Sequence, residues 1–149
     1  MAGALGAAGC EPTIPANYPA PPAVEVGSTA GNFAPLVDGA MVTINHGFQG
    51  GYHVWGAVRA VDLDPRQLRA RFSLGLDDGS PPLAVRDDVF DLDGTGDGLT
   101  PGTHVGTTVF LPDPALVRGL ACRLSVALTD REGRSGSDSH RVVPADPSP

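Results

Sequence analysis

Apolar and polar residues alternate along most of the chain, in short runs that turn-forming residues separate. The clearest run is 122–129, whose inward positions are Cys122, Leu124, Val126 and Leu128. A period of two places one face of a strand in a core and the other in solvent, so this run predicts a half-buried strand. Similar runs predict strands at 40–46, 52–61, 68–76, 83–92, 105–111 and 137–143.

Helix signals are sparse in comparison. Only residues 64–67 and 113–119 have a pattern that predicts a single helical turn. Glycine and proline account for 20 and 15 of the 149 residues, which excludes a helix bundle. About seven short strands with hairpin turns predict an all-β protein, built as an antiparallel sandwich of two sheets.

The end of the chain has a more specific pattern. The alternating run 122–129 is followed by a turn with Asp130 and Gly133, and then by Val142 and Val143. This order resembles the last hairpin of bacterial immunoglobulin-like and fibronectin-III-like domains. Trp55, on the second predicted strand, resembles the strand-C tryptophan of antibody domains, whose paired cysteines are absent here. The resemblance implies an immunoglobulin-like sandwich, which we expect to span residues 32–144.

The chain begins with small residues that lead to a cysteine. Residues 7–10, Ala-Ala-Gly-Cys, resemble a bacterial lipobox, in which the cysteine is lipidated. Position 7 is alanine where the lipobox usually has leucine. A basic start is missing and the apolar run before Cys10 is short, so residues 1–10 are interpreted as a truncated signal peptide with lipidation at Cys10. The alternatives are an Ala/Gly tail and, in an oxidising compartment, a Cys10–Cys122 disulfide. Residues 11–31 are interpreted as a Pro-rich linker and residues 145–149 as a disordered tail.

Charge and composition indicate the cellular location and the kind of partner. All ten basic residues are arginines, and alanine, glycine, proline and aspartate are abundant, as in proteins from GC-rich bacterial genomes. The net charge of −7 argues against nucleic acid as a partner. No apolar run reaches the length of a membrane span, so membrane contact is expected only through a lipid at Cys10. We therefore expect a bacterial cell-envelope or periplasmic protein, lipid-anchored or secreted.

Most of the negative charge lies in one segment. Residues 77–97 contain seven aspartates and a single arginine. Asp91, Asp93 and Asp97 lie among the glycines of residues 91–98, which resemble the short Asp/Gly calcium loops of secreted bacterial proteins. Calcium prefers six to eight oxygen ligands, which such a loop can supply, so these residues are candidate Ca²⁺ ligands. The alternative is a solvated loop in which the aspartates only cap turns.

The most distinctive string surrounds the second predicted strand. If Val54 faces the core, His53 and Trp55 face outward, beside Phe48 and Gln49 in the preceding loop. Exposed aromatic residues next to polar groups favour a binding surface for a protein or a glycan. In the opposite register Trp55 is buried and Tyr52 is exposed.

Catalytic motifs are absent from the sequence, with no nucleophile elbow, phosphate loop or dinucleotide fingerprint. No catalytic residues are assigned and no enzyme activity is expected. The main hypothesis is a non-catalytic envelope lipoprotein or surface binding or structural domain. One alternative is a calcium-stabilised adhesion module. The other is a metal-binding protein or metalloenzyme that uses His46, His53 and His104.

Overall fold

A computed structural model of the chain describes residues 18–47 and 50–147. Cys10, Phe48 and Gln49 lie outside these residues, and so do the predictions made for residues 1–10. The described residues form nine strands and one 3-10 helix, η1 (Pro114–Leu116). The strands are β1 (Ala23–Gly27), β2 (Ala40–Thr43), β3 (Asn45–His46), β4 (Tyr52–Val61), β5 (Leu68–Leu76), β6 (Ala84–Phe90), β7 (Gly102–Leu111), β8 (Cys122–Thr129) and β9 (Ser135–Ala145).

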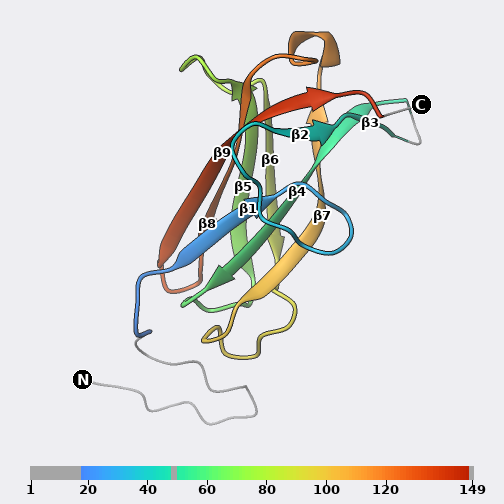
Figure 1. Cartoon of the computed structure of the whole chain (residues 1–149). Helices are drawn as coiled ribbons and strands as arrows, with labels where there is room; N and C mark the ends of the chain where they lie inside the picture. The colour runs from blue at the N-terminus through green and yellow to red at the C-terminus, as the bar shows by residue number, and fades with distance from the viewer. Residues whose placement is uncertain (1–17, 48–49, 148–149) are drawn as a thin grey trace.

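The strands form two sheets, which confirms the predicted all-β sandwich (Figure 1). In the four-stranded sheet, β4 pairs with β1 and β3 along one edge and with β7 along the other. The five-stranded sheet has the order β2-β9-β8-β5-β6. All pairs are antiparallel except β2 with β9, which is parallel and departs from the purely antiparallel prediction.

The predicted strand 40–46 is divided between the two sheets. Its first part is β2, in the five-stranded sheet, and its last part is β3, in the four-stranded sheet. Ile44, between them, is buried, and its backbone N–H donates a hydrogen bond to the carbonyl of Ala145 at 2.7 Å. The alternation of apolar residues continues through this crossing, so the sequence pattern could not show it.

The core lies between the sheets and comes from alternate residues of both. Val54, Val58 and Val109 of the four-stranded sheet are completely buried, as is Phe72 of the five-stranded sheet. Burying side chains of this size stabilises the fold by about 1.5–3 kcal/mol each. Gly56 faces this core, and a Cβ atom there would lie 2.7 Å from the Phe72 ring, so the close approach of β4 to β5 requires glycine.

The boundaries of the domain differ from the prediction. Strand β1 lies inside residues 11–31, which the composition assigned to a linker, and it pairs along β4. Val26 is fully buried, whereas Glu25 accepts a 2.7 Å hydrogen bond from Arg59. The sandwich therefore begins at Ala23, because a short alternating stretch is enough for an edge strand despite its proline neighbours. At the other end, β9 extends to Ala145.

Of the two predicted helical turns, the structure confirms the one at 113–119 and not the one at 64–67. Asp113 caps η1, where its carboxylate accepts a hydrogen bond from the Ala115 N–H at 3.0 Å. Residues 64–67 form no helix, and Gln67 has a positive φ of 52°. Within residues 18–47 and 50–147, no helix is long and apolar enough to cross a membrane.

Candidate functional site

An aromatic cluster lies on the outer face of the four-stranded sheet. His53 and Trp55 occupy alternate positions of β4, and Phe110 of β7 lies opposite His53 in the strand register. The His53 ring packs edge-on against Trp55, with a centroid distance of 4.5 Å, and lies 6.2 Å from Phe110. We call His53, Trp55 and Phe110 the aromatic patch. Of the two registers considered from the sequence, the structure has the one in which His53 and Trp55 face away from the core.

The three side chains differ in exposure. Phe110 is 56% exposed, Trp55 is half-buried and His53 is only 7% exposed. Exposed aromatic side chains of this size commonly mark a binding surface. Phe110 was not identified from the sequence, because only the pairing of β4 with β7 brings it beside His53.

The imidazole of His53 is the unusual member of the patch. Both ring nitrogens are buried, and neither has a hydrogen-bond partner among the residues that the structure describes. Burial lowers the pKa of His53, so the ring is neutral at pH 7. Leaving a buried polar group unpaired costs about 1–3 kcal/mol, and a position that carries such a cost is a candidate for function.

The candidate calcium ligands make three different contacts in the structure. Asp91 accepts a hydrogen bond from the Gln67 N–H at 2.8 Å, and Asp97 accepts one from the Leu99 N–H at 2.9 Å. Asp93 forms a backbone bridge with Thr103. Only the Asp97 contact caps a local turn, since Gln67 lies 24 positions from Asp91 and Asp93 uses its backbone. Calcium binding stays a prediction.

The three histidines of the metal hypothesis lie in different surroundings. His46 stacks on Tyr52 at 4.8 Å, and His53 follows Tyr52 on β4, so it projects to the opposite face of the sheet. His104 stacks on Phe90, with a centroid distance of 3.8 Å. In the described part of the chain, no three His, Cys, Asp or Glu side chains form a group that could hold a metal ion. Metal binding by these histidines stays a prediction.

Cys122 is a buried free thiol on the core face of β8, as the alternation predicted. Its pKa is raised by burial and by the charge of Asp77. A buried thiol with a raised pKa is a poor nucleophile, so its role is packing.

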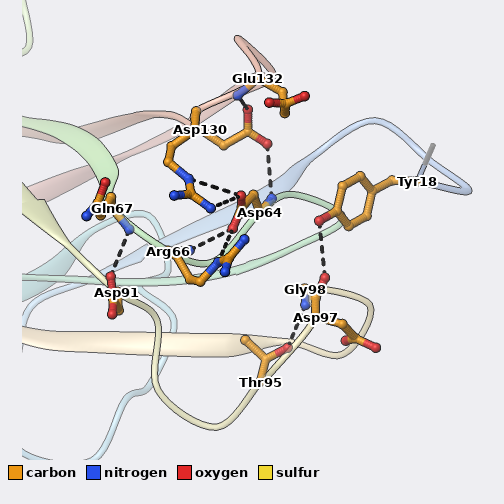
Figure 2. A network of polar contacts seen from close by, with 11 residues as sticks. Tyr18, Asp64, Arg66, Gln67, Asp91, Thr95, Asp97, Gly98, Asp130 and Glu132 are labelled. Carbon is orange, nitrogen blue, oxygen red and sulfur yellow. Dashed lines mark hydrogen bonds and ion pairs between the residues drawn. The ribbon is translucent and has the colours of Figure 1, made fainter. Parts of the chain in front are cut away.

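A polar network at one end of the sandwich was not predicted (Figure 2). Its centre is Asp130, which is 2% exposed and follows β8. The Asp130 carboxylate accepts three backbone hydrogen bonds, from Asp64 at 3.0 Å, Glu132 at 2.9 Å and Arg134 at 2.8 Å. These bonds hold the β4–β5 loop against the β8–β9 turn.

The second buried carboxylate of this network is Asp64. It accepts hydrogen bonds from Arg66 on one oxygen and from Arg131 on the other. Burial opposes its ionisation, but these hydrogen bonds and the Arg131 charge prevail and lower the pKa of Asp64. Asp64 is therefore a paired buried charge, an arrangement that serves structure.

Tyr18 connects the start of the described chain to this network. The Arg134 guanidinium lies 4.9 Å above the Tyr18 ring. The Tyr18 hydroxyl donates a 3.1 Å hydrogen bond to the Asp97 carbonyl (Figure 2). Burial, together with the charges of Asp64 and Asp130, raises the pKa of Tyr18 to about 12. Three loops and the segment before β1 are thus held together at this end.

Comparison with known proteins adds no functional assignment. No protein-family model matches the chain, and no curated protein matches it. The functional argument therefore rests on the geometry of the aromatic patch.

Proposed function

We propose that the protein is a non-catalytic binding domain of the bacterial cell envelope, and that the aromatic patch binds a sugar ring of an envelope glycan. The observation that carries the proposal is the position of Phe110 and Trp55 beside the buried, unpaired imidazole of His53. Phe110 and Trp55 offer apolar surface to the C–H face of a pyranose ring. The edge-on contact with His53 holds the Trp55 ring in one orientation.

The fold that presents the patch is, in this proposal, immunoglobulin-like. The first, fourth and seventh strands share one sheet, and the fifth, eighth and ninth share the other. This distribution parallels strands A, B and E against C, F and G of immunoglobulin domains, with β6 in the place of the extra strand beside C. The resemblance of the last hairpin to bacterial immunoglobulin-like domains supports the same assignment. Trp55 does not support it, because it lies on β4, in the place of strand B and not of strand C, and faces away from the core.

The proposed envelope location rests on the sequence. Residues 7–10 resemble a lipobox, and Cys10 would carry the lipid. Proline residues then recur up to the start of β1, which favours an extended spacer between the anchor and the sandwich. Such a spacer would hold the aromatic patch away from the membrane surface.

The chain provides its own reporter for this proposal, because Trp55 is its single tryptophan. Titration with soluble peptidoglycan fragments, followed by tryptophan emission, is expected to give a saturable change of intensity. Phe110→Ala removes the more exposed of the two stacking rings and is expected to weaken binding about tenfold, equivalent to about 1.4 kcal/mol.

The matched control is Val89→Ala, which truncates a similarly exposed apolar residue on β6 of the other sheet. It should bind the fragments as the wild type does. If emission does not change with added fragments, or if Phe110→Ala binds as tightly as Val89→Ala, the patch does not bind this glycan and the proposal fails.

A further inference from the structure

The outer face of the five-stranded sheet carries an open groove along β5 and β8. Small side chains form its floor, at outward positions of three neighbouring strands: Ser73, Ser125, Ala127, Ser137 and Ser139. Four depressions of about 320 to 680 Å³ follow one another along this face, and each shares two lining residues with the next. The depressions therefore form one continuous groove, on the opposite side of the sandwich from the aromatic patch.

The length of the groove follows from the strand register. At one end Arg69 lies opposite Thr129, and at the other end Gly75 lies opposite Arg123. A strand rises about 3.3 Å per residue, so this distance is about 20 Å. An extended peptide of about six residues covers the same length.

The outward strand positions of this face hold more arginines than aspartates, although the chain as a whole is acidic. Its outward positions hold two aspartates, Asp77 and Asp87, and four arginines: Arg69, Arg71, Arg123 and Arg141. The net charge of the chain is −7. At the β8–β9 turn, Arg131 and Glu132 line the same depression as Arg69 and add opposite charges. The outward side chains of this face therefore hold two more positive than negative charges, which favours an acidic partner over a basic one.

One of these arginines is not engaged by the protein itself. Arg71 pairs with Asp87 at 2.7 Å, whereas Arg123 and Arg141 share Asp77 at 3.1 and 3.0 Å. Within residues 18–47 and 50–147, Arg69 has no ion-pair or hydrogen-bond partner of its side chain. Arg69 lies where two depressions meet, so its guanidinium is available to a bound carboxylate.

The floor supplies further donors. The hydroxyls of Ser73, Ser125 and Ser137 have no side-chain hydrogen-bond partner in the described part of the chain, whereas Ser139 accepts a 3.0 Å bond from Arg123. No aromatic side chain lines the groove, so it lacks a stacking surface for sugar rings. A flat floor of small hydroxyl-bearing residues suits an extended peptide backbone better than a polysaccharide.

We propose that this groove binds an extended acidic segment of a partner protein. One carboxylate of the segment pairs with Arg69, and its backbone lies on the serine floor, where hydroxyls donate to carbonyl or carboxylate oxygens. This site is independent of glycan binding by the aromatic patch, because it uses the other sheet and different chemistry.

The test uses the full chain and a fluorescein-labelled peptide of eight glutamates, followed by fluorescence anisotropy. Saturable binding that weakens as salt is added is expected for the wild type. Arg69→Glu reverses the unpaired charge, and Ala127→Trp fills the floor without changing charge. Each is expected to raise the Kd about tenfold or more.

The matched control is Arg118→Glu, which makes the same charge change in the loop after η1, where Arg118 pairs with Asp146. It should leave the Kd close to that of the wild type. Circular dichroism confirms folding of each variant, and Arg69→Glu alone suffices if Ala127→Trp does not fold.

Three results would overturn the proposal. The first is that the peptide does not bind, or that it binds Arg69→Glu as tightly as Arg118→Glu. The second is that alginate, an anionic polysaccharide, binds in the groove and the peptide does not. The third is that the chain self-associates without peptide and Ala127→Trp dissociates it, which would make a second copy the occupant.

Discussion

Asp130 and His53 are both almost completely buried, at 2% and 7% exposure, but their surroundings are opposite. The Asp130 carboxylate accepts three backbone hydrogen bonds that connect two loops. The His53 imidazole has no such partner among the described residues and packs edge-on between two aromatic side chains on an outer face. Burial of Asp130 is accounted for by the hydrogen bonds that stabilise the fold. Burial of His53 has no such stabilising contact, and this difference makes the aromatic patch the candidate functional site.

The largest expected effect is on stability, when the Asp130 carboxylate is removed. Asp130→Ala leaves three backbone N–H groups without their acceptor, of which that of Asp64 is buried. It is expected to lower the free energy of unfolding by about 3 kcal/mol in urea denaturation. Asp130→Asn keeps an acceptor oxygen and should lose less. A loss below about 1 kcal/mol in Asp130→Ala would show that the network does not hold this end of the sandwich.

The two faces of the four-stranded sheet can be compared through one variant on each face. Gly56→Ala places a Cβ atom 2.7 Å from the Phe72 ring and is expected to destabilise the fold by about 2 kcal/mol through overpacking. Phe110→Ala, on the outer face, should cost less than about 1 kcal/mol. Thermal melting of both variants checks the order, and a larger loss in Phe110→Ala would place the aromatic patch among the structural elements.

The pH dependence of stability tests whether the His53 ring is neutral in the folded protein. Burial lowers the pKa of His53 and of His104 below 6.5, so the unfolded chain binds more protons than the folded one in this range. Stability is therefore expected to fall as the pH drops from 7 through 6.5 to the folded-state pKa values. His53→Leu should show a shallower loss in melts between pH 7 and pH 5. An unchanged slope would mean that His53 does not titrate on unfolding.

The smallest effect is expected on the opposite sheet. Arg71 and Asp87 form a 2.7 Å ion pair, but both side chains are 65% exposed. Such surface pairs stabilise proteins by about 0.5 kcal/mol or less, so Arg71→Ala should hardly change the unfolding free energy. A loss above about 1 kcal/mol would show that the charges of the groove serve the fold itself.

The sequence predicted what depends on local pattern and missed what depends on pairing. The run 122–129 became β8 with its predicted ends, because alternation alone defines a half-buried strand. Strand β1 was missed, since the prolines that precede it suggested a linker. Asp64 and Asp130 meet across 66 positions of the chain, and Phe110 reaches His53 only through the β4–β7 register. No periodicity in the sequence reports such long-range contacts.

The most direct measurement is the unfolding free energy of His53→Leu in urea, with Asp130→Asn measured alongside. If His53 is kept for binding, replacing its unpaired imidazole with an apolar side chain of similar size should leave stability unchanged or raise it by about 1 kcal/mol. Asp130→Asn should be less stable than the wild type in the same experiment. A loss in His53→Leu as large as that in Asp130→Asn would contradict the account, because His53 would then be a structural residue.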